Sequence, residues 1–473
     1  MGERSVQCGG EVVSLSYQVL GDTTVGEELE QGTFLPEKVF EFDIEQTDEA
    51  LIARAGLVLP HQMARALGLP GKIDRELPAP GSPRGLPPSA FVVPILLMLH
   101  GGGRVLEDLR ELRAEVSLRK LLNIRHLPAS CTVGDWLRRM GQDGRGLEGL
   151  DRVNGYLAGK ILDKDGDGGY VLDVDATIIE SEKARAQWTY QKVKGYQPLL
   201  GFVHRSKRGD GPAREGSELA GLIVADDFRD GNVPAGAKAV VFLERCVAKL
   251  PSGKRMEVVR SDSAWYQAEV LNWCEERGVR YVISADLDAG VREAIGTIKE
   301  WKGWRGDREI GETVHTMRDT KKAFRLVVVR WPKAQPDLFD QEPYCYHAVA
   351  TNGEEVAEEV VAFYDQRGEI ENWIKELKEG FGMSWMPCGE TYANAVYFRL
   401  GVIAYNLFIA MKALSLPGSW RKHTIATVRW RLYQMAGHVL WESRRVVLKL
   451  AASLERVRLL LGARRKVQQL APT

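Results

Sequence analysis

The stretch ILDKDGDGGYVLDVDATIIE, residues 161–180, decides the fold of this 473-residue chain. The Asp and Gly residues at 163–168 favour a tight turn, because Gly tolerates positive φ and Asp can hydrogen-bond its own backbone. The segment that follows alternates apolar and polar side chains, as a strand with one buried face does. Asp173 and Asp175 share the polar face. The segment is therefore either an edge strand with a solvated face or the first strand of a metal-binding sheet edge.

A calcium-binding loop is the competing interpretation of this turn. Asp163, Asp165, Asp167 and Gly168 occupy the first, third, fifth and sixth positions of an EF-hand loop. The twelfth position, which requires a Glu, is Val174, and the segment around it is strand-like rather than helical. We therefore prefer a turn that leads into a strand.

The composition is that of an ordinary soluble protein, with 44% hydrophobic and 27% charged residues. Six cysteines without a Cys-x-x-Cys pair argue against a zinc ribbon or a disulfide scaffold, and favour a reducing cytoplasm. The N-terminus lacks the apolar core of a signal peptide. The runs FVVPILLML and LGVIAYNLFIAM are shorter than the roughly 20 residues of a membrane span. We expect both to be buried helices and expect no membrane association.

The net charge is zero, but the charges are unevenly distributed along the chain. Residues 1–50 hold twelve Asp and Glu against Arg4 and Lys38, whereas residues 412–466 hold thirteen Lys and Arg against two Glu. A basic C-terminal region can supply contacts to DNA phosphates. A pair of solvated amphipathic helices would give the same pattern, so the charge alone leaves both interpretations open.

The chain changes character several times. An acidic leader ends in a Pro/Gly-rich linker at 74–88, and helical periodicity follows over 89–141, typical of either a DNA-reading module or a plain bundle. From about 156 the pattern is mixed α/β. We predict a helix at 264–277, and strands at 170–176, 199–204, 220–224, 256–260 and 280–286. Asn352, with Glu355 three residues later, predicts a capping box at the start of a helical stretch that reaches Leu414.

A second candidate site lies in FYDQRGEIENWIKELKEGFG, residues 363–382. On a regular helix Tyr364, Arg367, Glu371 and Lys378 fall within an arc of about 60°, at the border between the apolar and solvated faces. Such a stripe could hold a phosphate backbone beside a metal ligand. Ordinary helix pairs, such as Arg367 with Glu371, would explain it equally well.

A third candidate is Asp262 in MEVVRSDSAWYQAEVLNW, residues 256–273, where a strand ends and a helix begins. Asp262 could be a helix N-cap. It could equally be a carboxylate at the C-terminal edge of a sheet, where α/β folds usually place their ligand chemistry.

Together these stretches resemble one class of bacterial insertion-sequence transposases with an Asp-Asp-Glu active site. The spacing of Tyr364, Arg367, Glu371 and Lys378 matches the Tyr-x2-Arg-x3-Glu-x6-Lys signature of that class. LDVDAT resembles its first-aspartate motif and RSDSAWY its second, although Ala264 and Trp265 replace the usual Gly and Phe. The likeness extends in order over roughly residues 90–460, and the acidic leader lies outside it.

The resemblance implies an α/β chain with a ribonuclease-H-like catalytic core. The first Asp would lie on the first strand, the second just beyond the fourth, and the Glu on a later helix. The expected organisation is a leader and linker at 1–88, a helical DNA-binding region at 89–155, a core at 156–286 and 346–414 interrupted by a β-rich insertion at 287–345, and a basic helical C-terminal region at 415–473.

The resemblance also implies a catalytic and metal-binding triad of Asp175, Asp262 and Glu371. Asp175 is preferred as the first carboxylate because of its Asp-Ala-Thr context, and Asp173 is the alternative. Phosphodiester cleavage develops charge on two oxygens, which a pair of Mg²⁺ ions about 3.5–4 Å apart can stabilise. Mg²⁺ prefers oxygen ligands, Mn²⁺ is expected to substitute, and zinc is disfavoured without a His or Cys cluster.

The family's reaction then sets the expected function. DNA is nicked at the ends of a mobile element, the free 3′-OH forms a hairpin that is reopened, and the 3′-OH is joined to target DNA. Tyr364, Arg367 and Lys378 would bind phosphates, and Trp301 or Trp304 could receive an unstacked base. The expected partners are terminal inverted repeats, target DNA and a second copy of the chain, in the bacterial cytoplasm at the nucleoid. The alternatives are a nuclease or recombinase of the same fold without strand transfer, and a catalytically lapsed DNA-binding protein.

Overall fold

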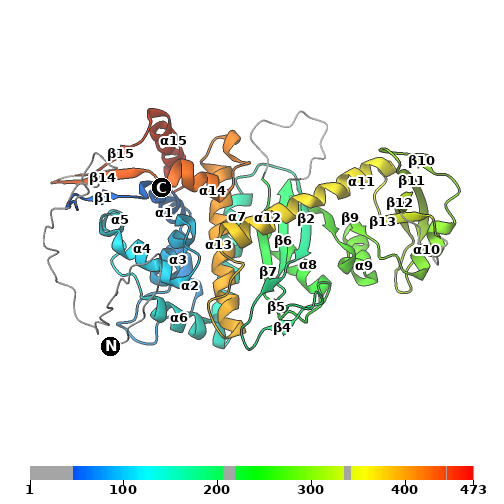
Figure 1. Cartoon of the computed structure of the whole chain (residues 1–473), viewed down its shortest axis with the longest axis horizontal. Helices are drawn as coiled ribbons and strands as arrows, with labels where there is room; N and C mark the ends of the chain where they lie inside the picture. The colour runs from blue at the N-terminus through cyan, green and yellow to red at the C-terminus, as the bar shows by residue number, and fades with distance from the viewer. Residues whose placement is uncertain (1–45, 206–218, 335–341, 444, 472–473) are drawn as a thin grey trace, which may run out of the picture. The chain divides into compact units, whose positions relative to one another are not determined.

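The computed structural model describes residues 46–205, 219–334, 342–443 and 445–471. Residues from Ala50 onward form one compact unit. Residues 1–45 of the predicted leader lie outside the described residues, whereas residues 46–88 are described and include the helices α1 (Val58–Ala66) and α2 (Leu69–Glu76). Figure 1 shows the order of the elements along the chain, with a large sheet beside a group of helices.

A nine-stranded mixed sheet carries the strands predicted from the sequence. Across the sheet, the strands in order are β10 (Lys302–Gly303), β11 (Glu309–His315), β12 (Phe324–Pro332), β13 (Tyr344–Thr351), β9 (Arg280–Ser284), β8 (Arg255–Ser261), β2 (Gly169–Ala176), β6 (Leu199–Arg205) and β7 (Leu222–Asp227). Strands β2, β8 and β9 run parallel, and every other pairing is antiparallel. The strands of the predicted insertion therefore extend the same sheet, because β13 pairs with β9.

The turn before β2 is confirmed. Gly166 and Gly168 have φ values of 49° and 133°, which a residue with a side chain rarely adopts. The next elements also follow the prediction closely: a 3-10 turn at Ser263–Trp265 leads into α9 (Ala268–Arg277), in place of one helix over 264–277.

The apolar runs form buried helices, as predicted. They lie in α3 (Ser89–Gly101) and α13 (Thr391–Leu414). Helix α13 is long and apolar enough to cross a membrane, but its apolar window is completely buried in the protein. It contacts α3, α6 (Ser130–Gln142), α7 (Arg145–Leu162) and β7, and in Figure 1 it stands between the N-terminal helices and the sheet. Helix α13 is thus the core helix that joins the two parts.

Two local predictions are wrong. Asn352 does not cap a helix, because its side chain bonds the backbone of Val279 and Tyr281, and α11 (Ala357–Asp365) begins later, after Val356. The C-terminal region is not wholly helical either. A hairpin of β14 (Ala436–Glu442) and β15 (Arg445–Ala451) joins β1 (Leu51–Ile52) in a small sheet before helix α15 (Leu454–Leu470). Its Val-rich, alternating sequence favours strands over a helix.

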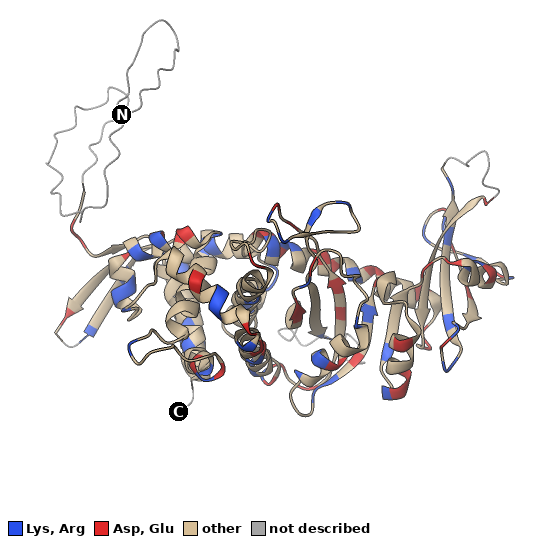
Figure 2. Cartoon of the chain, turned by 90° about the horizontal axis from the view of Figure 1, so that it is seen from below, with Lys and Arg blue, Asp and Glu red and all other residues tan. Residues whose placement is uncertain are grey.

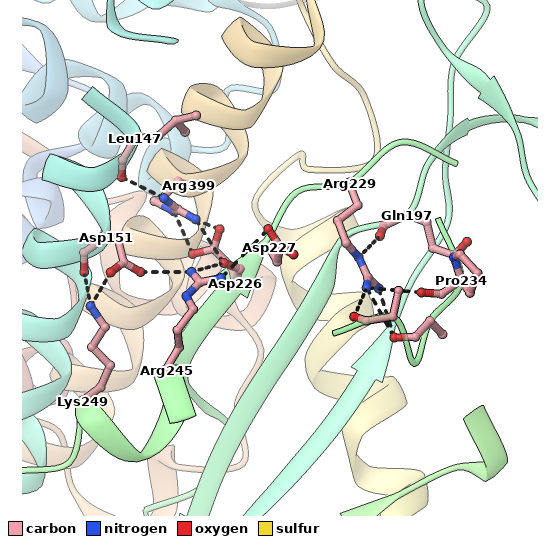
Figure 3. Close-up of polar contacts among 12 residues, drawn as sticks. Leu147, Asp151, Gln197, Asp226, Asp227, Arg229, Pro234, Arg245, Lys249 and Arg399 are labelled. Carbon is pink, nitrogen blue, oxygen red and sulfur yellow. Dashed lines mark hydrogen bonds and ion pairs between the residues drawn. The ribbon is translucent and has the colours of Figure 1, made fainter. Parts of the chain in front are cut away.

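A buried ion pair fastens α13 to the edge of the sheet (Figure 3). Arg399 Nε lies 2.9 and 3.0 Å from the two carboxylate oxygens of Asp226, at the end of β7. Arg399 also donates to the carbonyl of Leu147 at 2.8 Å, and Arg245 donates to the Asp226 carbonyl at 3.0 Å. A second cluster in the figure is separate: Arg229 donates to the carbonyls of Gln197 and Pro234.

Arg399→Ala is expected to lower the free energy of unfolding by about 3–5 kcal/mol, because it leaves the Asp226 carboxylate buried without its partner. The measurement is a urea unfolding curve at neutral pH. Lys321→Ala, which breaks an exposed pair with Glu276, is the control and should cost at most about 1 kcal/mol. Equal losses in the two variants would contradict the structural role of the buried pair.

Candidate active site

Two carboxylates meet at the C-terminal edge of neighbouring parallel strands. Strands β2 and β8 pair in a register that sets Asp173 opposite Arg260 and Val174 opposite Ser261. One residue further along each strand are Asp175 and Asp262, so both lie at the same sheet edge. Asp262 Oδ1 also accepts a hydrogen bond from the amide of Ala264 at 3.2 Å. Both interpretations of Asp262 therefore hold, because it caps the 3-10 turn and still faces Asp175.

Arg367 lies between these two carboxylates. Its Nη2 is 3.0 Å from Asp175 Oδ2 and 3.7 Å from Asp262 Oδ2. A 3-10 turn at Gln366–Gly368, between α11 and α12 (Glu369–Lys375), brings Arg367 to this position. The routine helical pair with Glu371 is therefore not the main contact of this guanidinium.

Glu371 lies on α12 with an exposed side chain. Its charge nevertheless reaches the sheet edge, because it contributes to the pKa of Asp175. Burial is the main reason that this pKa is raised to about 6. Arg367 opposes the rise, whereas the negative charges of Asp262 and Glu371 add to it. Three carboxylates therefore act on one small region of the protein.

The positions of Asp175, Asp262 and Glu371 meet only part of what a divalent metal ion requires. Two carboxylates already share one positive charge, and oxygen donors of this kind are those that Mg²⁺ prefers. Within residues 46–205, 219–334, 342–443 and 445–471, no three His, Cys, Asp or Glu side chains converge as a metal site would require. Asp175 and Asp262 thus fit a divalent ion, and Glu371 would have to close on them to complete the set.

The other two residues of the predicted stripe flank this centre. Lys378 lies on a π-helical turn, Glu376–Gly380, and its Nζ donates to the carbonyl of Ile178 at 2.7 Å, just after β2. Tyr364 is half-buried at the end of α11, where its ring packs 5.0 Å from His347. Burial raises the pKa of Tyr364, so the hydroxyl is neutral at physiological pH.

Asp173, the alternative first carboxylate, lies in different surroundings. Arg260 Nε and Nη2 donate to its two oxygens at 2.6 and 2.7 Å, and both side chains are buried. His204 Nε2 is 3.0 Å from Asp173 Oδ2. Burial would raise the pKa of Asp173, but hydrogen bonds from Arg260 and His204 outweigh it and hold the pKa below its usual value. Both oxygens of this carboxylate are thus already engaged within the protein.

Arg260 and His204 did not stand out in the sequence. One signal for Arg260 was available: it precedes Asp262 by two residues, just as Asp173 precedes Asp175, and period-two side chains share a face. Arg260 also donates to the carbonyl of Phe363 near the end of α11. This pair therefore connects β2, β8 and the helical stretch that carries Arg367.

The two tryptophans considered for an unstacked base are partly covered. The Arg330 guanidinium lies 4.0 Å from the centroid of the Trp301 ring, and Trp301 also packs near Tyr346. Arg305 lies 4.3 Å from the ring centroid of Trp304, which packs against a buried apolar cluster that includes Val171, Val258 and Val282. Each ring therefore already has an arginine packed against it.

Comparison with known protein families gives a match over most of the chain. Residues 41–472 match the family model described as transposase DDE domain group 1. The comparison with curated proteins gives no match. The match covers every described strand and helix around Asp175, Asp262 and Glu371, and the chain belongs to the DDE transposase domain group 1 family.

Proposed function

We propose that the chain is a transposase of the Tyr-x2-Arg-x3-Glu-x6-Lys class, which cuts DNA at the ends of a mobile element and joins the free 3′-OH to target DNA. The observation that carries this proposal is that Asp175 and Asp262 both approach the guanidinium of Arg367 and that the charge of Glu371 acts on Asp175. The five strands β2, β6, β7, β8 and β9, with Asp175 on the first and Asp262 just after the fourth, support a ribonuclease-H-like core.

The metal ligands in this proposal are Asp175, Asp262 and Glu371. DDE transposases generally use divalent metal ions. Two Mg²⁺ ions held there would stabilise the charge that develops on the attacking and leaving oxygens of the phosphodiester. Asp175, Asp262 and Glu371 would hold the ions through their carboxylate oxygens. Glu371 is exposed on a short helix, so it can approach the other two carboxylates when DNA binds.

Arg367 and Lys378 would bind the DNA backbone. Arg367 can exchange its carboxylate partners for a phosphate, because a guanidinium binds both groups in the same fork geometry. Lys378 would leave the Ile178 carbonyl and contact a phosphate near the scissile bond. Tyr364 would donate its hydroxyl proton to a phosphate oxygen, and no covalent protein–DNA intermediate is needed.

The Arg367→Ala and Lys378→Ala variants are expected to weaken hairpin formation more than the first nick. The first nick needs only one strand in place, whereas the hairpin step requires a bent strand that these cations hold. The measurement is the ratio of hairpin to nicked product on an end duplex in a denaturing gel. Lys375→Ala, on the solvated side of α12, is the matched control. An unchanged product ratio would remove both residues from the hairpin step.

Strand transfer from a pre-nicked end with Mg²⁺ tests the function itself. Wild-type protein is expected to join the exposed 3′-OH to plasmid DNA, and Glu371→Gln is expected to lose joining while still shifting the end duplex in a gel. A nuclease or recombinase without strand transfer would cut but never join. A lapsed DNA-binding protein would shift the duplex and do neither.

The proposed partners are double-stranded DNA with terminal inverted repeats, target DNA, and a second copy of the chain bound at the other end. A transposase must bind DNA, but in this structure basic and acidic residues are interspersed over the helices and strands in view (Figure 2). We expect recognition of DNA to use local clusters of cations.

A further inference from the structure

A small sheet projects from the chain directly after Asp175. Its strands are β3 (Ile179–Glu180), β5 (Lys194–Tyr196) and β4 (Gln187–Trp188), in that order. Strand β3 begins at Ile179, four residues after Asp175, so the sheet starts at most about 14 Å from the candidate active site along the backbone. It therefore begins close to the carboxylates at which DNA would be cut.

The root of the sheet is firmly anchored. Tyr196 is fully buried, packs 4.9 Å from the Phe228 ring, and accepts a hydrogen bond from Asn394 of helix α13 at 3.2 Å. Lys378, seven residues after Glu371, bonds the carbonyl of Ile178. The start and the end of the small sheet are thus held by contacts to the turn that carries Lys378 and to helix α13.

The outer part of the sheet exposes large aromatic rings. Trp188 is 62% exposed and Tyr190 is 74% exposed, and both lie on the β4–β5 hairpin. A third ring, Trp385, is 47% exposed and lies on the segment that follows the Glu371 helix. Lys183, from the sheet, is 5.3 Å from the centroid of the Trp385 ring, so the two segments touch. Exposed aromatic rings grouped in this way usually mark an interaction site.

The same segment of the chain is rich in basic residues. The small sheet and its loops carry four cations: Lys183, Arg185, Lys192 and Lys194. In the part of the chain that the structure describes, no ion pair within 4.0 Å joins any of them to a carboxylate, although Glu180 and Glu182 lie on the same segment. Arg185 lies near enough to Glu390 to interact with its charge, but among the described residues none of the four cations is held in a close ion pair, so they are available for an anionic ligand. Aromatic faces combined with a basic surface are the arrangement that binds single-stranded nucleic acid.

We propose that this aromatic–basic ridge, formed by residues 183–194 and Trp385, binds an unpaired segment of DNA next to the scissile bond. Trp188 and Tyr190 stack on bases, and the four cations contact the phosphates on either side. The proposal rests on the function proposed above, since the DNA strand is the substrate of the same centre. It assigns the stacking role to the ridge, whose rings are more exposed, rather than to Trp301 or Trp304, each of which packs against an arginine.

The test is binding of a fluorescein-labelled twelve-nucleotide oligo(dT) to the full chain in EDTA, so that catalysis plays no part. The Trp188→Ala, Tyr190→Ala double variant is expected to bind at least about tenfold more weakly, from lost base stacking. Trp188→Phe should retain most of the affinity. Trp430→Ala, which removes a ring that is 74% exposed elsewhere, is the matched control and should bind like the wild type. A thermal melt checks that each variant is folded.

A charge variant tests the phosphate contacts separately. The double variant Lys183→Glu, Arg185→Glu should have a shallower slope of log affinity against log salt concentration for oligo(dT). The change should correspond to the loss of about one to two phosphate contacts, because each contact releases counterions. Unchanged affinity in the aromatic variant and an unchanged salt slope in the charge variant would overturn the proposal. The proposal would also be overturned if the aromatic variant bound oligo(dT) normally but had a different sedimentation coefficient from the wild type, because the ridge would then contact a second copy of the chain. If the aromatic variant loses oligo(dT) binding and the wild type cleaves DNA with Mg²⁺, both proposals are supported. If the wild type binds oligo(dT) through the ridge but never cleaves DNA, only the proposed function is contradicted.

Discussion

Asp175→Asn is expected to slow nicking of an end duplex by about a thousandfold or more. The substitution keeps the shape of the side chain but removes the charge that would hold metal ions against the scissile phosphate, and a loss of roughly 4 kcal/mol in transition-state stabilisation has that effect. The measurement is single-turnover nicking with Mg²⁺, with binding of the end duplex followed in parallel.

The control for this prediction is Asp163→Asn, in the exposed turn before β2. It should nick at the wild-type rate. Full cleavage by Asp175→Asn would exclude this carboxylate from the centre and return attention to Asp173. If Asp175→Asn lost both duplex binding and cleavage, the variant would instead have disturbed the fold.

The same assay run against pH gives a second view of Asp175. Burial raises its pKa to about 6 in the absence of a bound ion, so the carboxylate is charged above that pH and neutral below it. The reaction needs the charged form, and the nicking rate should therefore fall as the pH drops below about 6. Higher Mg²⁺ should move the midpoint to lower pH, because the metal competes with the proton.

Arg260→Ala is expected to have the largest effect on stability near the site, about 3–5 kcal/mol, because it leaves the fully buried Asp173 carboxylate without its bidentate partner. Urea unfolding measures this loss. The double variant Asp173→Val, Arg260→Met replaces the pair with apolar groups of similar bulk, and should recover most of the stability.

The double variant also separates a positioning role from a purely structural one. If the pair serves to hold β2, β8 and the end of α11 in their relative positions, the stable double variant should still nick more slowly than the wild type at saturating Mg²⁺. Rescue of both stability and nicking would show that the pair only stabilises the fold, with no effect on the placement of Asp175 and Asp262.

Much of the core could be predicted from local patterns. The strand that carries Asp175 alternates and follows a Gly-rich turn, and the strand before Asp262 is a short Val-containing run, so the predicted positions of both agree with the structure to within a few residues. The approach of Asp175 and Asp262 follows from a simple rule, since the carboxyl ends of parallel strands meet at one sheet edge.

The parts that could not be predicted depend on tertiary context. The helical stripe assumed a regular 100° step, but the stretch contains a 3-10 turn before Glu371 and a π turn at Lys378, which redirect Arg367 toward Asp175. Asn352 has the sequence of a cap, yet it bonds to the β9 region instead. The pairing of Asp173 with Arg260 needed the register of β2 with β8, which no local pattern contains.

The Arg367 guanidinium already balances part of the negative charge of Asp175 and Asp262. While Arg367 stays there, a divalent ion must compete with a tethered positive charge for the same oxygens. DNA phosphates that attract Arg367 away would free those oxygens, so substrate and metal should each strengthen the binding of the other. A protein built in this way would be slow to cut any DNA that failed to engage that arginine.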